Sequence, residues 1–146
     1  MASRKEERLS AILIKAGLVD ELQMRSAMAK LGKFGGRLPK VLADSGFADE
    51  DDITVAIGKA TGFTVTHLGT VLKYGDAMSN VDVKFCDEHA VFPVSLKDRV
   101  MTLAMVDPSE LDVVDAVKVR CGTRVQPLLA SETEIRNAVM RNYRGQ

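Results

Sequence analysis

Residues 8–31, RLSAILIKAGLVDELQMRSAMAKL, return 29 positions later as residues 37–60, RLPKVLADSGFADEDDITVAIGKA. Arginine and leucine open both copies, and glycine and aspartate recur at matching places inside them. Each copy has 24 residues, and a spacer of five residues joins them. A repeat at a fixed period marks a duplicated structural unit. Since two copies are too few for a solenoid, the repeat predicts a pseudo-symmetric pair of helix-turn-helix units.

The first copy predicts two helices separated by a glycine turn. Three apolar side chains lie at helical spacing within a helix expected over residues 4–15. Gly17 suits the left-handed position that ends a helix, and Asp20 suits the cap of the next one. That second helix is expected to reach about Leu31, and the spacer after it is expected to form a loop.

The second copy repeats this plan. Arg37 opens a short helix that tolerates Pro39 in its first turn, and Gly46 ends that helix. Asp49 then caps a longer helix whose first turn is acidic, which the helix dipole favours. The two copies together predict a helical lobe over residues 1–62.

The remaining chain predicts a mixed lobe over residues 82–146, after a less regular, partly β-prone connector at residues 63–81. Apolar runs and turn signals give this lobe the order α-β-β-α-β-α. Its elements are expected at residues 82–89, 90–96, 99–106, 109–120, 123–129 and from 131 to 143. The fold class is therefore α+β, with a helical lobe followed by a small mixed lobe.

Three details of the mixed lobe are also predicted. Lys97 and Asp98 are expected to form a tight turn between the two strands. Leu111 is expected to face inward with the valines of its helix. Ser131 is expected to cap the last helix, with Glu134 completing a capping box.

Composition excludes several classes of protein. The 146 residues are 46% hydrophobic and 27% charged, which is typical of a globular domain. The 20 basic and 20 acidic residues balance, which argues against a binder of nucleic-acid polymers, although residues 1–40 carry nine basic residues against four acidic ones. No run approaches the roughly 18 apolar residues that a membrane helix needs, and no signal peptide is evident. A cytoplasmic protein without direct membrane insertion is expected.

No catalytic or metal-binding signature stands out. The chain has no P-loop sequence, so hydrolysis of a nucleotide through such a loop is not expected. His67 and His89 lack partners at metal-ligand spacing, and the isolated Cys86 and Cys121 are interpreted as buried small apolar residues. The acidic run at residues 49–52 lacks the spacing of a calcium loop. Neither enzymatic activity nor a cofactor is expected.

Arg8 and Arg37 carry the remaining chemistry. Each is expected in the first turn of a short helix beside a leucine, so the repeat offers two equivalent half-sites for a ligand with two phosphates and two flat bases. Arginine binds phosphate in a forked geometry and stacks on flat rings, and helix N-termini add backbone donors. The alternative is that the duplication serves only packing, in which case the apolar residues of both copies are core.

The repeat resembles the tandem motif of the N-terminal domain of type II secretion and type IV pilus assembly ATPases. In the cyclic-di-GMP-binding branch, the MshEN domain, the motif begins Arg-Leu-Gly, continues through aliphatic pairs and a glycine, and ends near a glutamine. The matching residues are Arg8, Leu9, Leu13, Ile14, Gly17, Leu18, Val19, Met24 and Met28, then Arg37, Leu38, Leu42, Ala43, Gly46, Phe47, Ala48, Ile53 and Ile57. The second lobe resembles the rest of that domain at residues 91–94, residues 104–108 and the closing helix to Tyr143.

The resemblance implies a cyclic-di-GMP-binding regulatory module without ATPase activity of its own, working with a protein partner in a secretion, pilus or signalling system. It implies arginines that bind phosphate or stack on guanine, apolar surfaces under the bases, and a carboxylate that accepts hydrogen bonds from guanine. The implied ligand-binding residues are Arg8, Leu9, Ser10, Leu13, Gly17, Met24, Met28, Arg37, Leu38, Pro39, Leu42, Gly46, Ile53, Ile57 and Asp107.

Four positions depart from the motif. Ser10 and Pro39 replace its glycine, and Leu31 and Ala60 replace its glutamine. Glycine permits close backbone approach to a ligand, and proline also removes an N–H donor. The Ser10 and Pro39 substitutions favour a second interpretation, a ligand-independent adaptor that docks a type II secretion or type IV pilus system onto a protein partner. Since the ATPase half is absent from residues 1–146, a stand-alone regulator or an excised N-terminal domain is expected.

Overall fold

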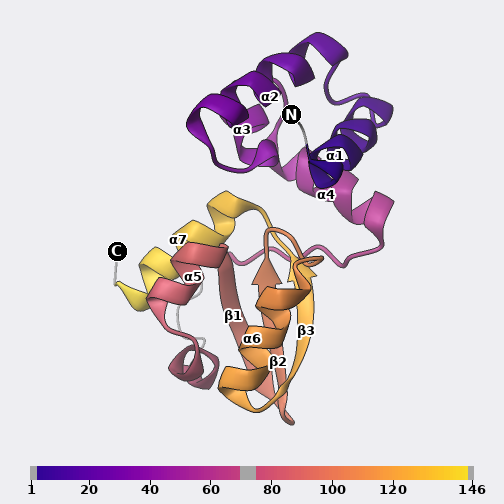
Figure 1. Cartoon of the computed structure of the whole chain (residues 1–146). Coiled ribbons are helices and arrows are strands. Elements are labelled where there is room, and N and C mark those ends of the chain that lie inside the picture. The colour runs from indigo at the N-terminus through magenta and orange to yellow at the C-terminus, as the bar shows by residue number, and fades with distance from the viewer. Residues whose placement is uncertain (1–2, 70–74, 145–146) are drawn as a thin grey trace. The chain divides into compact units, whose positions relative to one another are not determined.

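A computed structural model describes residues 3–69 and 75–144, and it confirms the α+β class (Figure 1). Within these residues the chain forms seven α-helices, one 3-10 helix and one three-stranded sheet. It divides into two compact units, Met1–Phe63 and Thr64–Gln146, each with its own core. The first unit contains only helices, and the second contains the sheet.

The N-terminal unit consists of α1 (Arg4–Lys15), α2 (Glu21–Phe34), α3 (Leu38–Asp44) and α4 (Glu50–Thr61). Side-chain caps start three of these helices. Ser3 and Glu6 form a reciprocal capping box on α1, Asp20 forms one with Gln23 on α2, and Asp49 caps α4. Such caps satisfy backbone N–H groups that a helix start otherwise leaves without partners, which explains why the predicted starts of α1, α2 and α4 are confirmed.

The same chain reversal follows α1 and α3. The N–H of Gly17 donates to the carbonyl of Ile14 at 3.0 Å, and the N–H of Leu18 donates to the carbonyl of Leu13 at 3.2 Å. Shifted by 29 residues, Gly46 donates to Ala43 at 3.0 Å and Phe47 donates to Leu42 at 3.1 Å. This is the Schellman pattern, and the glycine φ angle is 76° in both turns.

Alanine at either glycine is expected to destabilise the fold. In Gly17→Ala and Gly46→Ala the free energy of unfolding should fall by about 1 kcal/mol, because a Cβ is strained at positive φ. Gly32→Ala is the matched control: Gly32 lies inside α2 with nothing within 4 Å of an added Cβ, so alanine should stabilise by about 0.5–1 kcal/mol. Urea denaturation measures all three, and a loss of stability in Gly32→Ala equal to the others would contradict the assignment.

Two of the helix pairings are equivalent under an approximate two-fold relation. In the N-terminal unit α1 packs on α4, and the equivalent helices α3 and α2 pack on each other. The core between them is apolar and fully buried, since Leu13, Leu42 and Ile53 each have 0% exposure. The helical lobe of two pseudo-symmetric units is therefore built around equivalent leucines.

The copies differ at their ends. The spacer was predicted as a loop, but α2 continues through Phe34 and ends at Gly35, whose φ is 76°. α1 has 12 residues whereas α3 has seven. The reason is that the Ser3–Glu6 capping box adds a turn before the repeat begins, and the second copy has no such cap.

The C-terminal unit contains η1 (Gly75–Asn80), α5 (Val83–His89), β1 (Val91–Lys97), β2 (Val100–Met105), α6 (Leu111–Cys121), β3 (Arg124–Leu129) and α7 (Glu132–Tyr143). The sheet has the order β1-β2-β3, with β1 and β2 antiparallel and β2 and β3 parallel (Figure 1). The parallel pair is joined by α6, which packs on β3, while α7 packs on α5 and on β1. The predicted order α-β-β-α-β-α is confirmed.

Three predicted details of the strands and α6 are wrong. The hairpin turn lies at Asp98 and Arg99, whose φ angles of 52° and 62° suit a primed turn that matches the twist of the strands, so Lys97 still belongs to β1. α6 begins at Leu111 rather than at residue 109, because the carboxylate of Asp107 accepts hydrogen bonds from the N–H and hydroxyl of Ser109 and holds an extra turn. Leu111 is 69% exposed and does not face inward.

The predicted capping box on α7 is only half formed. Ser131 accepts a hydrogen bond from the N–H of Glu134 at 3.2 Å, as expected. The Glu134 carboxylate, however, accepts from the N–H of Leu68 at 2.9 Å and contacts Nδ1 of His67 at 3.1 Å. Glu134 therefore ties the segment before the sheet to α7 instead of closing on the helix start.

The segment predicted as a connector contributes to the C-terminal unit. Leu129 donates to the carbonyl of Thr64 and accepts from the N–H of Thr66, both at 2.8 Å, so the β-prone stretch forms a short bridge. Further on, Leu68, Ala77 and Val81 are buried in the core of this unit. Residues 70–74 of the predicted connector lie outside the described residues.

β3 carries a proline on its outer side. The bonds to Thr64 and Thr66 show that the backbone polar groups of Leu129 point away from β2. Because these directions alternate along a strand, Pro127 lies two residues back on the same outer side. Its missing N–H would therefore have faced away from the sheet.

The two cysteines differ in burial. Cys86 is fully buried, and its thiol donates to the hydroxyl of Tyr143 at 3.7 Å, which in turn donates to the carbonyl of Val81 at 2.6 Å. Cys121 is half-buried, so the interpretation as a buried apolar residue fits Cys86 better. Burial raises the pKa of Cys86 from 9.0 to about 11. The hydrogen bond to Tyr143 lowers this pKa, and the negative charges of Asp87 and Asp82 raise it further.

Cys86 is therefore expected to be unreactive in the native protein. In a Cys121→Ser variant, its alkylation by iodoacetamide at pH 8 should be about 100-fold slower than in urea, because a pKa higher by two units leaves that much less thiolate. Since the folded state holds this proton more tightly, stability should fall as the pH rises from about 9 to about 11. Equal alkylation rates with and without urea would contradict this burial.

Candidate ligand-binding site

The two arginines of the repeat do not occupy equivalent places within their helices. Arg37 is the N-cap residue of α3, where its side chain makes no capping bond, and it is half-buried. Arg8 is the fifth residue of α1 and is exposed, so the prediction that it lies in a first turn is wrong. The start of α1 is a turn away, and there the N–H of Glu6 already donates to the hydroxyl of Ser3. The guanidinium group itself is what Arg8 offers to an anion.

Most of the apolar residues predicted to bind the ligand lie in the core. The buried members of that set are Leu13, Met24, Leu38, Leu42, Ile53 and Ile57. Leu9 and Met28 are half-buried and still present surface. The apolar contact available to a ligand therefore comes from these two, and the buried residues hold the helices that carry the arginines.

The polar and turn residues of the predicted site are near the surface. Gly17 and Gly46 are exposed and form the Schellman turns. Ser10 lies half-buried within α1, and Pro39 lies half-buried in the first turn of α3. The positions of the missing glutamines, Leu31 and Ala60, also reach the surface.

Asp107 belongs to the other unit, just after β2. It is half-buried, and one oxygen of its carboxylate already accepts two hydrogen bonds from Ser109. A carboxylate has further acceptor positions, so a guanine edge remains chemically compatible with it.

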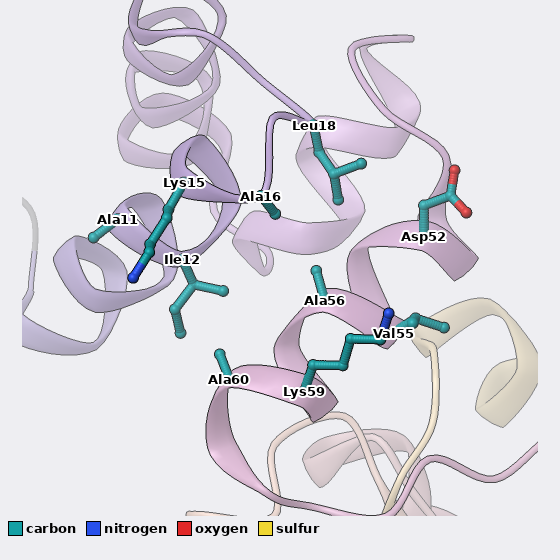
Figure 2. A pocket seen from close by; sticks show the side chains of 10 residues that line it. All are labelled: Ala11, Ile12, Lys15, Ala16, Leu18, Asp52, Val55, Ala56, Lys59 and Ala60. Carbon is teal, nitrogen blue, oxygen red and sulfur yellow. The ribbon is translucent and has the colours of Figure 1, made fainter.

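The structure also contains a hollow that the sequence did not suggest. We call it the α1–α4 groove; it has a volume of about 690 Å³ and is lined by Ala11, Ile12, Lys15, Ala16, Leu18, Asp52, Val55, Ala56, Lys59 and Ala60. Figure 2 shows Lys15 on α1 and Lys59 on α4, with the small apolar side chains between the two helices. None of these ten residues was among the predicted ligand contacts.

A comparison of the two repeat copies could have indicated this groove. Its residues Ala16, Leu18 and Ala60 correspond, by the shift of 29, to Ser45, Phe47 and Leu31. At all three positions the α1–α4 side has the smaller side chain, and it is the side that is hollow. The sequence signal for the groove is therefore a difference between the copies, whereas the predicted half-sites consist of residues that the copies share.

The family model described as the MshEN domain matches residues 61–146. The chain belongs to the MshEN domain family. The match covers the whole C-terminal unit and begins at the last residue of α4, so the MshEN assignment is independent of the helical repeat.

Known proteins resemble this MshEN chain over nearly its whole length. The type IV pilus assembly ATPase PilB of Myxococcus xanthus is 29% identical over 136 residues, covering 93% of the chain and 24% of that protein. PilB of Thermus thermophilus is 24% identical over 140 residues, covering 94% of the chain and 16% of that protein. The chain thus spans about a quarter or less of the length of these curated relatives.

Solved structures share the MshEN fold. The structure of MshE with cdg superposes with a TM-score of 0.70 at 20% identity, covering 92% of this chain and 98% of that one. The N-terminal domain of XpsE superposes with a TM-score of 0.74 at 18% identity, covering 97% and 99%. Both matches include the helical unit, so its arrangement of helices is shared. Within residues 3–69 and 75–144, no helix combines the length and apolar character that crossing a membrane requires.

Proposed function

We propose that this chain is a cyclic-di-GMP-binding regulatory module of the secretion and pilus ATPase type, cytoplasmic and without ATPase activity of its own. The observation that carries the proposal is the duplicated helix-turn-helix. Each copy has an Arg-Leu pair, at residues 8–9 and at residues 37–38, and the same type of Schellman turn follows each pair. MshE, whose structure was solved with cdg, the abbreviation of this dinucleotide, supports the choice of ligand.

The chemistry of the half-sites suits a cyclic dinucleotide. Such a ligand has two phosphates and two guanines related by two-fold symmetry, and the repeat supplies one arginine in each copy, at residues 8 and 37. A guanidinium group can bind a phosphate in a forked geometry or stack on a base. Leu9 and Met28 offer surface to the bases, while the buried leucines and isoleucines fix the helices.

A specific observation favours the second candidate, a ligand-independent docking adaptor of a type II secretion or type IV pilus system. Pro39 lies in the first turn of α3 and cannot donate a backbone hydrogen bond there. Leu31 and Ala60 supply no amide at the ends of the two copies. Of the polar contacts expected in the helical unit, the two arginines are then left to bind the dinucleotide.

Isothermal titration calorimetry separates the two candidates. Titration of cyclic-di-GMP into the folded 146-residue chain should give saturable heat at tens of micromolar ligand. A chain that is folded by circular dichroism and gives no such heat would refute dinucleotide binding. The adaptor predicts, in addition, that capture of a protein partner by the immobilised chain is the same with and without the dinucleotide.

A further inference from the structure

The α1–α4 groove has a filled counterpart on the other side of the repeat. Between α2 and α3, Nζ of Lys30 donates to the hydroxyl of Ser45 at 2.9 Å and lies 5.4 Å from the centre of the Phe47 ring. Ala27, on the same helix as Lys30, is fully buried, whereas its equivalent Ala56 is half-exposed and lines the groove. Side chains from both copies therefore occupy the α2–α3 side at the positions whose equivalents line the α1–α4 groove.

The α1–α4 side lacks the contacts that Lys30 makes on the α2–α3 side. Lys59 is the equivalent of Lys30, but Ala16 offers it no hydroxyl and Leu18 offers it no ring. Lys15 stands where the second copy has Asp44, which pairs with Lys40 at 2.9 Å. Neither Lys15 nor Lys59 forms an ion pair with any residue in the described parts of the chain.

The groove combines a floor of small apolar residues with two cationic edges. Four of its lining residues are alanines, which allow the backbone of another segment to approach closely. One lysine extends from each bounding helix, and Asp52 is the single acidic residue among the lining residues (Figure 2). Each bounding helix has 12 residues, so the groove offers a length of at most about 18 Å.

We propose that the α1–α4 groove docks an amphipathic helix of a protein partner, with a small apolar face toward the alanines and acidic residues along both flanks toward Lys15 and Lys59. Helix-in-groove recognition uses this combination of an apolar seam and charged flanks. Desolvated apolar contacts supply affinity, and charge complementarity selects the acidic partner.

The asymmetry of the repeat distinguishes this site from the proposed dinucleotide site. A two-fold symmetric ligand needs two matching halves, whereas the side chains that line the α1–α4 groove differ from those at the equivalent positions on the α2–α3 side. An asymmetric occupant such as a single helix fits that arrangement. The docking proposal therefore does not depend on dinucleotide binding.

The test is a peptide selection against the whole chain. A displayed library of helix-forming peptides of about 14 residues, a little longer than the bounding helices, is selected on the native chain. It is counter-selected on the triple variant Ala16→Ser/Leu18→Phe/Ala60→Leu, which copies Ser45, Phe47 and Leu31 into the open half. Enriched peptides are expected to share a small apolar face with flanking glutamates or aspartates.

Fluorescence polarisation with the strongest selected peptide completes the test. Binding should fall by about tenfold or more in Lys15→Glu/Lys59→Glu and be lost in the triple variant. Arg25→Glu, an exposed charge reversal on α2, is the control and should leave binding unchanged. The proposal is overturned if no peptide prefers the native chain to the triple variant, if the selected peptides are not acidic, or if the double lysine variant binds as well as the native chain. Thermal melts of all variants verify that each is folded.

Discussion

Removing both arginines of the repeat is expected to reduce the affinity for cyclic-di-GMP by about 100-fold or more. A hydrogen bond to a charged group contributes about 1.5–3 kcal/mol, and 1.4 kcal/mol corresponds to a factor of ten in affinity. Arg8→Ala and Arg37→Ala should therefore each weaken binding by about tenfold or more, and the double variant should lose both contributions. Calorimetry under the conditions used for the native chain measures the change.

The single variants also test whether the half-sites are equivalent. Arg8 is exposed on α1 and Arg37 is half-buried at the start of α3, so their contributions are expected to differ in size while sharing their direction. Arg25→Ala, on the exposed side of α2, is the matched control and should bind as the native chain does. Unchanged affinity in both Arg8→Ala and Arg37→Ala would remove these residues from the site.

The largest stability effects are expected at the equivalent leucines in the N-terminal core. Leu13 and Leu42 are both 0% exposed, and each lies at the turn where a Schellman bond closes its helix. Replacement by alanine removes buried methyl groups and leaves a cavity, which costs about 2–5 kcal/mol of unfolding free energy. Leu13→Ala and Leu42→Ala should therefore shift the midpoint of urea denaturation strongly, with similar shifts in the two variants.

Leu9→Ala is the control for these core variants. Leu9 is half-buried, so its replacement should lower the unfolding free energy by less than either core variant. If instead Leu13→Ala left stability unchanged and altered only dinucleotide affinity, the leucine would be a ligand contact rather than a core residue. The comparison thus separates the packing and binding interpretations of the repeat residue by residue.

Much of the fold could be predicted from the sequence where a local physical signal exists. The ends of α1 and the start of α4 follow from helical periodicity, the capping residue Asp49 and the glycine at residue 17. Glu134 shows where such reasoning stops: its sequence position satisfies the capping-box pattern, but Leu68 supplies a backbone donor from another segment and takes the carboxylate. A contact 66 residues away in the chain leaves no local sequence signal.

The candidate site was predictable in its position along the chain but not in its exposure. A shift of 29 residues makes Leu9 and Leu38 equivalent, yet Leu38 is 2% exposed and Leu9 is half-buried. The difference arises because α1 begins a turn before the repeat whereas α3 begins within it. The groove could not be predicted from the residues that the copies share, because it depends on positions where they differ, such as Leu18 and Phe47.

Pro127 has a consequence for how molecules of this domain behave at high concentration. An exposed strand edge is a template on which a second copy can add its own strand and so start an aggregate. On the outer side of β3 Pro127 has no N–H to donate to such a strand. Leu129, two residues further on the same edge, is already bonded to Thr64 and Thr66. This edge therefore resists sheet-to-sheet polymerisation, and many copies can be packed side by side without β3 joining them.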